Sequence, residues 1–200
     1  NGRMPGGYQL TYTTLASILK YPCSSIQCDK KVPHRKKYGY FKSDSNTFLS
    51  VCRELNMLPD PDYGQAFLRH PFVFLVEAAD DICYSIMDYE DAHRLGILKT
   101  EEVKKTFLKV IQLNKTEDLN RLNERLEILS SDANETIAYL RAKAISTLVL
   151  KASEAFCQNT EMIKKGAFQY ALLDWNEDVK KVVSNIKKDS FERIYNYKSV

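Results

Sequence analysis

The chain has 200 residues, of which 44% are hydrophobic and 11% aromatic, with only seven glycines and six prolines. This composition suffices for a sizeable core and favours helices over a turn-rich β-sandwich. The 29 basic and 26 acidic residues give a formal net charge of +3, which neither supports nor excludes nucleic acid as a partner. No run approaches the ~20 apolar residues of a membrane span and no signal segment opens the chain, so we expect no membrane association.

The N-terminal third predicts two short helices separated by a basic loop. A first helix is expected from Tyr8 to about Tyr21, where Pro22 stops the apolar pattern. Residues 23–43 are irregular and rich in lysine, which predicts a loop with a cationic patch. A second short helix is expected over 45–55, before a stretch rich in proline and aspartate.

The centre of the chain predicts one long helix. Pro71 suits a first helical turn, because proline lacks only an amide hydrogen that would be unpaired there, and Gly96 is a plausible stop. One apolar stripe is expected along this helix, formed by Leu75, Ala78, Ala79, Ile82 and Ile86.

Periodic apolar residues predict further helices in the second half of the chain. The expected ranges are 100–113, 119–130, 132–156, 160–165, 174–187 and 189–196. Since no strand pattern or internal repeat is found, the predicted fold class is all-α.

The five cysteines are an odd number and favour reduced thiols in a cytoplasm over a disulfide framework. Only Cys23 and Cys28 are close in sequence, and with three histidines in the chain no zinc quartet assembles from the spacing. We interpret the cysteines as buried or incidental thiols.

Two carboxylates and a phenol are expected on one face of the long helix. Asp80, Tyr84 and Asp88 are spaced at i, i+4 and i+8, so each lies only ~40° further around the helix axis. Burying the acids beside the apolar stripe would be costly unless a metal ion, a base or a ligand compensated them. The alternative is a solvated acidic face with Tyr84 packed at its margin.

The surrounding string carries a family resemblance. Its parts are Arg69-His70-Pro71, then Glu77-Ala78-Ala79-Asp80-Asp81-Ile82, then Tyr84 and Asp88-Tyr89-Glu90-Asp91, with further matches in 10–22 and in Lys36-Lys37-Tyr38-Gly39-Tyr40-Phe41. The string resembles the corresponding segment of bacterial deoxyguanosinetriphosphate triphosphohydrolases (dGTPases), which belong to the HD-domain superfamily of metal-dependent phosphohydrolases. The resemblance is clear over 8–98. It implies a partial helical bundle of the HD type, with 1–98 as the C-terminal part of the hydrolase core and 99–200 as a helical C-terminal region.

The resemblance also implies a divalent cation, Mg or Mn, held by two histidines and two aspartates. Asp80 matches the last of these ligands; Asp81 is adjacent but points about 100° away around the helix. The other three ligands find no match here, because His34 and His93 are isolated and neither precedes an aspartate. The chain by itself is therefore expected to be inactive.

Further residues receive substrate roles from the resemblance. Tyr84 would pack on the deoxyribose where a 2′-hydroxyl would lie, and Asp88 would accept a hydrogen bond from the 3′-hydroxyl. Lys36 and Lys37 are either partners of the triphosphate or solvated loop charges. Arg141 and Lys143 are either contacts to a phosphate or sugar, including one on a neighbouring subunit, or an ordinary surface pair. His70 is interpreted as a capping or packing residue and not as a metal ligand.

The implied activity is hydrolysis of dGTP to deoxyguanosine and inorganic triphosphate by a metal-activated water, in a cytoplasmic homo-oligomer, a hexamer by analogy. One alternative is a dNTP-binding regulatory or oligomerisation module without catalysis, which the missing ligands favour. Another is a purely structural helical bundle. The sequence assigns no residue to the purine edge and no allosteric dNTP site.

Overall fold

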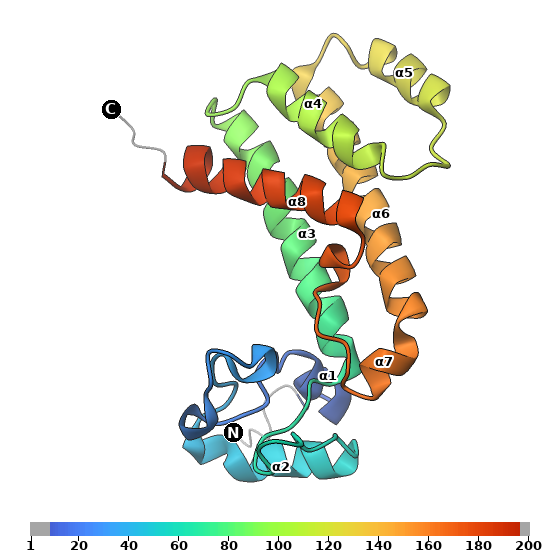
Figure 1. Cartoon of the computed structure of the whole chain (residues 1–200). Helices are drawn as coiled ribbons and strands as arrows, with labels where there is room; N and C mark the ends of the chain where they lie inside the picture. The colour runs from blue at the N-terminus through green and yellow to red at the C-terminus, as the bar shows by residue number, and fades with distance from the viewer. Residues whose placement is uncertain (1–8, 197–200) are drawn as a thin grey trace. The chain divides into compact units, whose positions relative to one another are not determined.

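The structure is a computed structural model that describes residues 9–196, and within this range it contains helices and no β-strand (Figure 1). This confirms the all-α fold class. Over the described residues, the chain forms two compact units. One contains residues 9–77 with Asn159–Gln169, and the other contains Ala78–Gln158 with residues 170–196. The compact units thus divide within the long helix, whereas the division at 98/99 rests on the resemblance and stays a prediction.

The first unit combines short helices with loops. Its elements are α1 (Tyr12–Ser17), three 3₁₀ turns η1 (Ser25–Gln27), η2 (Pro33–Arg35) and η3 (Lys42–Asp44), α2 (Ser45–Glu54), the start of α3 (Pro71–Arg94) and α7 (Thr160–Lys164). Phe48, Val51 and Phe74 are buried in its core, and the ring of Phe168 packs edge-on against Phe74 at 5.4 Å between centroids.

Helix α1 is shorter than predicted. The Thr11 hydroxyl caps it by accepting a hydrogen bond from the Thr14 N–H at 3.2 Å, and its C-cap is Ile18, four residues before Pro22. Ile18 is 60% exposed, so its side chain provides little packing that would extend the helix. The predicted start at Tyr8 lies outside the described residues.

Helix α3 begins and ends as the sequence predicts. His70 precedes the helix, and its Nδ1 accepts a hydrogen bond from the Phe72 N–H at 3.2 Å, which confirms the capping role. Arg69 pairs with Glu77 at 2.8 Å and also lies over the Phe74 ring. After Arg94, Gly96 has φ of +71°, a backbone conformation that glycine adopts without strain.

The predicted apolar stripe is partly wrong. Ala78, Ile82 and Ile86 are buried, but Leu75 is 37% exposed and Ala79 is also exposed. Ser85, Tyr89 and Glu90 are buried as well, so the buried side of α3 includes polar side chains that the predicted apolar stripe left out.

The His70 cap makes stability depend on pH. Burial lowers the pKa of His70, so between the folded and unfolded pKa values the unfolded chain binds more protons. The stabilisation by neutral His70 is therefore complete above about pH 6.5 and is lost as the pH falls below it. In urea unfolding, we expect the free energy of unfolding of the wild type to fall relative to that of His70→Asn, a non-titrating cap, as the pH is lowered from 7.5 to 5.5. If the free energy of unfolding changes with pH in the same way in both proteins, the His70 cap does not cause the pH dependence.

The second unit contains the rest of α3 and the longer helices. Its other elements are α4 (Thr100–Ile111), α5 (Leu119–Ile128), α6 (Ala133–Gln158), η4 (Leu172–Asp174), α8 (Glu177–Ser190) and the π-helical turn η5 (Phe191–Tyr195). Helix α4 packs against α6, and α8 packs against α4 and η4. Among the helices within residues 9–196, none has an apolar stretch long enough to cross a membrane.

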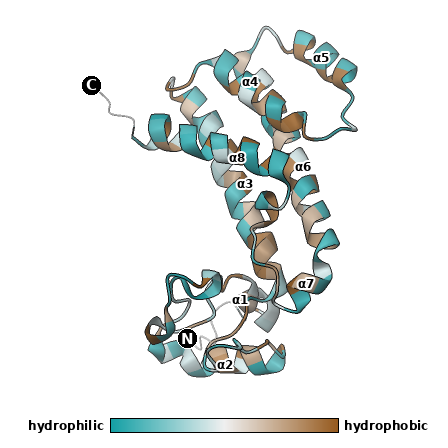
Figure 2. Cartoon of the chain, viewed as in Figure 1, coloured by the Kyte–Doolittle hydropathy of each residue, from teal (hydrophilic) through white to brown (hydrophobic). Residues whose placement is uncertain are grey.

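Helix α8 differs from its prediction at both ends. Asn176 caps it by accepting the N–H groups of Asp178 and Val179, so the helix starts three residues later than expected. The predicted break before 189 is wrong, because α8 continues to Ser190 and η5 follows at once. A continuous buried edge explains this: Val179, Val183, Ile186 and Ser190 recur at helical spacing, and hydrophobic and hydrophilic residues alternate along α8 in Figure 2.

Candidate functional site

Asp80, Tyr84 and Asp88 lie on the solvent-facing side of α3. Asp80 is exposed, Tyr84 is 58% exposed and Asp88 is partly exposed, whereas Ile82 and Ile86 on the other side are buried. We call these three residues the acidic face. Because the carboxylates are in contact with solvent, their charge requires no buried partner.

The acids on α3 differ in whether they have a partner. Glu77 accepts from Lys20 at 2.7 Å and from Arg69 at 2.8 Å, and Asp81 pairs with Lys187 at 2.9 Å. Within residues 9–196, Asp80 makes no hydrogen bond or ion pair through its carboxylate. Its two oxygens are therefore free to bind a ligand, while those of its nearest acidic neighbours are engaged.

Asp88 has a partner that sequence reasoning missed. The Tyr195 hydroxyl donates a hydrogen bond to Oδ2 of Asp88, 107 residues away in the chain. This hydrogen bond raises the pKa of Tyr195 to about 12, so the phenol stays a donor at neutral pH. Oδ1 of Asp88 remains an acceptor for a second donor, such as a sugar hydroxyl. The sequence signal for this tyrosine is the string Arg193-Ile194-Tyr195, which loosely resembles the same family.

Several contacts hold the segment with Tyr195 against α3 and α4. Tyr89 donates a hydrogen bond to Asp189, and burial, followed by this bond, raises the pKa of Tyr89. Arg193 donates to both carboxylate oxygens of Glu102 at 3.1 Å. The position of Tyr195 next to Asp88 therefore depends on packing along α8 and η5.

The described part of the chain does not contain a metal site. No three His, Cys, Asp or Glu side chains within residues 9–196 gather as metal ligands would. The histidines are also engaged elsewhere: His34 with Asp60, His70 at the start of α3, and His93 with the Thr100 hydroxyl at 2.9 Å. One exposed carboxylate does not hold a divalent cation, so the residues of this chain alone do not fit the cofactor that the resemblance implies.

Arg141 and Lys143 both have carboxylate partners. Arg141 lies 2.7 Å from Glu90, which is 2% exposed and also accepts from Arg94 at 2.9 Å. Lys143 lies 2.5 Å from Glu117. A substrate would have to compete with these carboxylates, and the predicted substrate contacts of Arg141 and Lys143 remain predictions.

The contact with Glu90 predicts a structural effect for Arg141. In Arg141→Gln, the buried Glu90 keeps only Arg94, so we expect a loss of about 1 to 2 kcal/mol in unfolding free energy by urea titration. Lys143→Gln is a suitable control, because its partner Glu117 is less deeply buried at 13% exposure and the expected loss is below about 1 kcal/mol. Equal stability of Arg141→Gln and wild type would contradict the structural role.

Lys36 and Lys37 belong to the first unit and are exposed. Contacts on both sides fix the backbone around them: Arg35 pairs with buried Asp60 at 2.8 Å, and the Cys23 thiol donates to the Lys37 carbonyl at 3.2 Å. Gly39 packs so closely that an added Cβ would lie 2.1 Å from the Tyr21 carbonyl oxygen. Only glycine fits there, which explains its place after the lysines.

The geometry thus defines an all-helical protein that presents two carboxylates and a phenol on one exposed helix face. No protein-family model matches the chain. A deoxyguanosinetriphosphate triphosphohydrolase-like protein of Synechocystis is 33% identical over 175 residues, which is 85% of this chain and 37% of that protein. One of Listeria monocytogenes is 30% identical over 97% of this chain and 41% of its own length. The deoxyguanosinetriphosphate triphosphohydrolase of Yersinia enterocolitica is 29% identical over 96% of this chain and 39% of its own length.

The chain belongs to the deoxyguanosinetriphosphate triphosphohydrolase family. It spans about two fifths of the length of these relatives.

Proposed function

We propose that this chain provides the sugar-binding face, and one metal-ligand aspartate, of a dGTP triphosphohydrolase. The observation that carries the proposal is the acidic face: Asp80 is exposed and unpaired within residues 9–196, while Glu77 and Asp81 on either side are ion-paired. Tyr84 and Asp88 lie on the same side of the helix. The names of the relatives support a triphosphohydrolase-like activity.

The proposed reaction is hydrolysis of dGTP to deoxyguanosine and inorganic triphosphate. The oxygen of water forms a bond to the α-phosphorus, the bond from this phosphorus to the 5′-oxygen breaks, and the 5′-oxygen takes up a proton. In the whole protein, Asp80 would contribute an oxygen ligand to a divalent cation, for which Mg or Mn is suited by oxygen ligands. Lys36 and Lys37 would neutralise phosphate charge.

Tyr84 and Asp88 would select the sugar. The exposed Tyr84 ring offers a flat surface that would crowd an added 2′-hydroxyl, and Asp88 keeps one carboxylate oxygen for the 3′-hydroxyl while Tyr195 holds the other. Arg141 and Lys143 remain proposed phosphate or sugar contacts. A cytoplasmic homo-oligomer, with a hexamer as the first expectation, also remains a proposal.

Product analysis tests the reaction. The whole protein is incubated with dGTP and Mn or Mg, and the products are separated by ion-exchange chromatography. We expect deoxyguanosine and inorganic triphosphate in equal amounts. Release of dGMP and pyrophosphate, or no product from any of the four dNTPs, would overturn the proposed reaction.

Substitution of Tyr84 tests the sugar selection. In Tyr84→Ala the ring that would crowd a 2′-hydroxyl is lost, so we expect the preference for dGTP over GTP, measured as the ratio of kcat/KM, to fall by roughly tenfold to a hundredfold. Tyr84→Phe keeps the ring and is expected to keep the ratio. If Tyr84→Ala also keeps this ratio, Tyr84 does not discriminate between deoxyribose and ribose.

A second candidate is a dNTP-binding module without catalysis. It is favoured by the lack of a three-ligand metal cluster within the described residues. Saturable dGTP binding by the whole protein, with no nucleoside product in the presence of Mn, would favour this function over hydrolysis.

A further inference from the structure

A lysine-lined groove lies in the second unit, away from the acidic face. Its volume is about 550 Å³, and it is bordered by the end of α4, by α6 and by α8 as far as Asn185. The lining residues are Lys109, Gln112, Leu113, Lys115, Lys151, Asn176, Asp178, Val179, Lys181, Val182 and Asn185. No residue of α3 lines it, so the groove is separate from Asp80, Tyr84 and Asp88.

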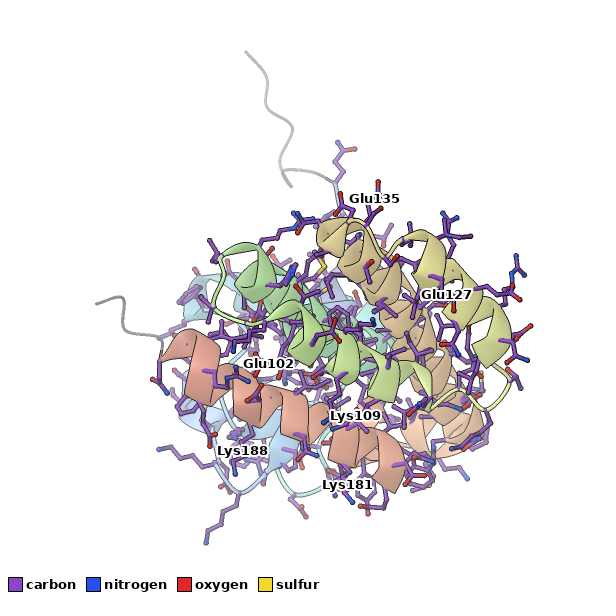
Figure 3. All side chains as sticks on the ribbon, turned by 90° about the horizontal axis from the view of Figure 1, so that it is seen from above. Glu102, Lys109, Glu127, Glu135, Lys181 and Lys188 are labelled. Carbon is purple, nitrogen blue, oxygen red and sulfur yellow. The ribbon has the colours of Figure 1, made fainter. Side chains whose placement is uncertain are left out.

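The charge in the groove is strongly positive. Four lysines and one aspartate line it. Figure 3 labels Lys109 on α4 and Lys181 on α8, two helices that pack together. Compact grooves lined by one sign of charge concentrate ions of the opposite sign. The groove therefore favours an anion.

Three of these lysines have no carboxylate partner. Within residues 9–196, no carboxylate oxygen lies within 4.0 Å of the side-chain nitrogen of Lys109, Lys115 or Lys181. Lys151, by contrast, pairs with Glu154 at 2.8 Å. The contrast is clear along α8. The other lysines of that helix, Lys180, Lys187 and Lys188, each have an acidic partner at 3.6, 2.9 and 3.9 Å.

Helix dipoles account for only part of this arrangement. Lys109 lies in the last turn of α4, where a cation is stabilised by the partial negative charge of the helix end. Lys181 lies in the second turn of α8, near the positive end of that helix, and gains nothing from the dipole. The helix dipole therefore gives no reason for Lys181 to lie in the same groove as Lys109 and Lys115.

The remaining lining suits oxygen acceptors. Oδ1 of Asn176 accepts hydrogen bonds from the N–H groups of Asp178 and Val179 at 3.0 and 3.1 Å, so its amide contributes N–H donors and no further acceptor is needed from it. Gln112 and Asn185 contribute further amides. A ligand with several adjacent negative oxygens matches these amides and the lysine ammonium groups, and a chain of phosphates has this chemistry.

We propose that the groove formed by Lys109, Lys115 and Lys181 binds a polyphosphate chain. Two sources share this chemistry: free inorganic triphosphate, and the triphosphate group of a nucleotide. The proposal does not depend on the acidic face or on hydrolysis.

Calorimetric titration of the whole protein with inorganic triphosphate, in buffer with a metal chelator, tests the proposal. We expect saturable binding that weakens as salt is raised. In Lys109→Gln/Lys115→Gln/Lys181→Gln, the affinity should fall by at least about tenfold. The matched control is Arg53→Gln/Lys105→Gln/Lys165→Gln, which removes three exposed cations that are unpaired within residues 9–196 and so lowers the formal net charge by the same amount as the groove variant. The affinity of the control variant for triphosphate should lie within about twofold of that of the wild type.

A third variant separates this site from the proposed active site. Lys36→Gln/Lys37→Gln removes the predicted phosphate contacts of the other unit and should leave the calorimetric affinity unchanged. If the affinity for triphosphate falls in this variant and not in the groove variant, the groove proposal is overturned and the proposed function is unaffected.

Chemical labelling gives a second readout that needs no variant. Triphosphate should protect Lys109, Lys115 and Lys181 from acetylation, as measured by mass spectrometry, but not Lys105 or Lys165. Equal protection of all five lysines from acetylation would overturn the proposal. So would a calorimetric titration without saturable heat, or an equal loss of triphosphate affinity in the groove and control variants.

The ligand source follows from two further titrations. If dGTP and inorganic triphosphate bind equally, the phosphate chain alone is the ligand. If dGTP binds at least about tenfold more tightly, the ligand is a nucleotide whose base or sugar also contacts the apolar part of the groove, formed by Leu113, Val179 and Val182. Deoxyguanosine alone should show no binding in the first case.

Discussion

Replacing Asp80 by asparagine should lower the turnover of dGTP by the whole protein on the order of a thousandfold, because the proposed cation would lose a charged oxygen ligand. Asparagine has nearly the same size, and Asp80 is exposed and unpaired within residues 9–196, so the unfolding free energy should change by less than about 0.5 kcal/mol. The measurement is kcat/KM for dGTP at saturating Mn, with the unfolding free energy from urea titration alongside.

Asp81→Asn is the matched control for this prediction. It removes the adjacent carboxylate and its ion pair with Lys187, whose two side chains are 32% and 46% exposed, so the cost in stability should stay below about 1 kcal/mol. Activity should remain within a few-fold of wild type. If Asp81→Asn loses activity and Asp80→Asn keeps it, Asp81 is the ligand. If both keep it, this part of α3 is only a solvated acidic surface.

Replacing Asp60 by alanine should destabilise the chain by about 3 to 5 kcal/mol, because it leaves buried polar groups without their partner. Asp60 is 3% exposed. Its Oδ2 accepts from His34 and lies next to the Arg35 guanidinium, both at 2.8 Å, and its Oδ1 accepts the backbone N–H groups of Asp62 and Tyr63. Urea unfolding measures the loss.

Asp62→Ala is the control, since Asp62 is exposed and contributes only a backbone N–H to this cluster. Its stability should lie within about 0.5 kcal/mol of wild type. Equal stability of the Asp60 and Asp62 variants would show that the cluster does not stabilise the fold.

The pKa of Asp60 sets the pH range of its contribution. Burial alone would raise this pKa, but the hydrogen bonds from His34 and from the Asp62 backbone, together with the charges of His34 and Arg35, lower it overall. A lowered folded pKa means that the stabilisation is complete above the unfolded value of about 3.9 and is lost as the pH falls below it. The Asp60 comparison is therefore best made near neutral pH.

The sequence by itself determined the helical fold and the positions of most helices. Pro71 with His70 before it, and Gly96 after Arg94, mark the ends of α3 through contacts within a few residues. The same local geometry places Asp80, Tyr84 and Asp88 on one side of the helix, because helical periodicity depends only on neighbours along the chain.

Only the tertiary structure decided which of these groups are engaged. Asp81 differs from Asp80 because Lys187, 106 residues away, reaches it, and Asp88 gains Tyr195 from η5. The partner of Arg141, the continuous α8 and the lysine groove likewise depend on packing between distant segments. Ion pairs and grooves of this kind depend on which surfaces meet in the fold, and periodicity within one helix carries no information about the surface that it meets.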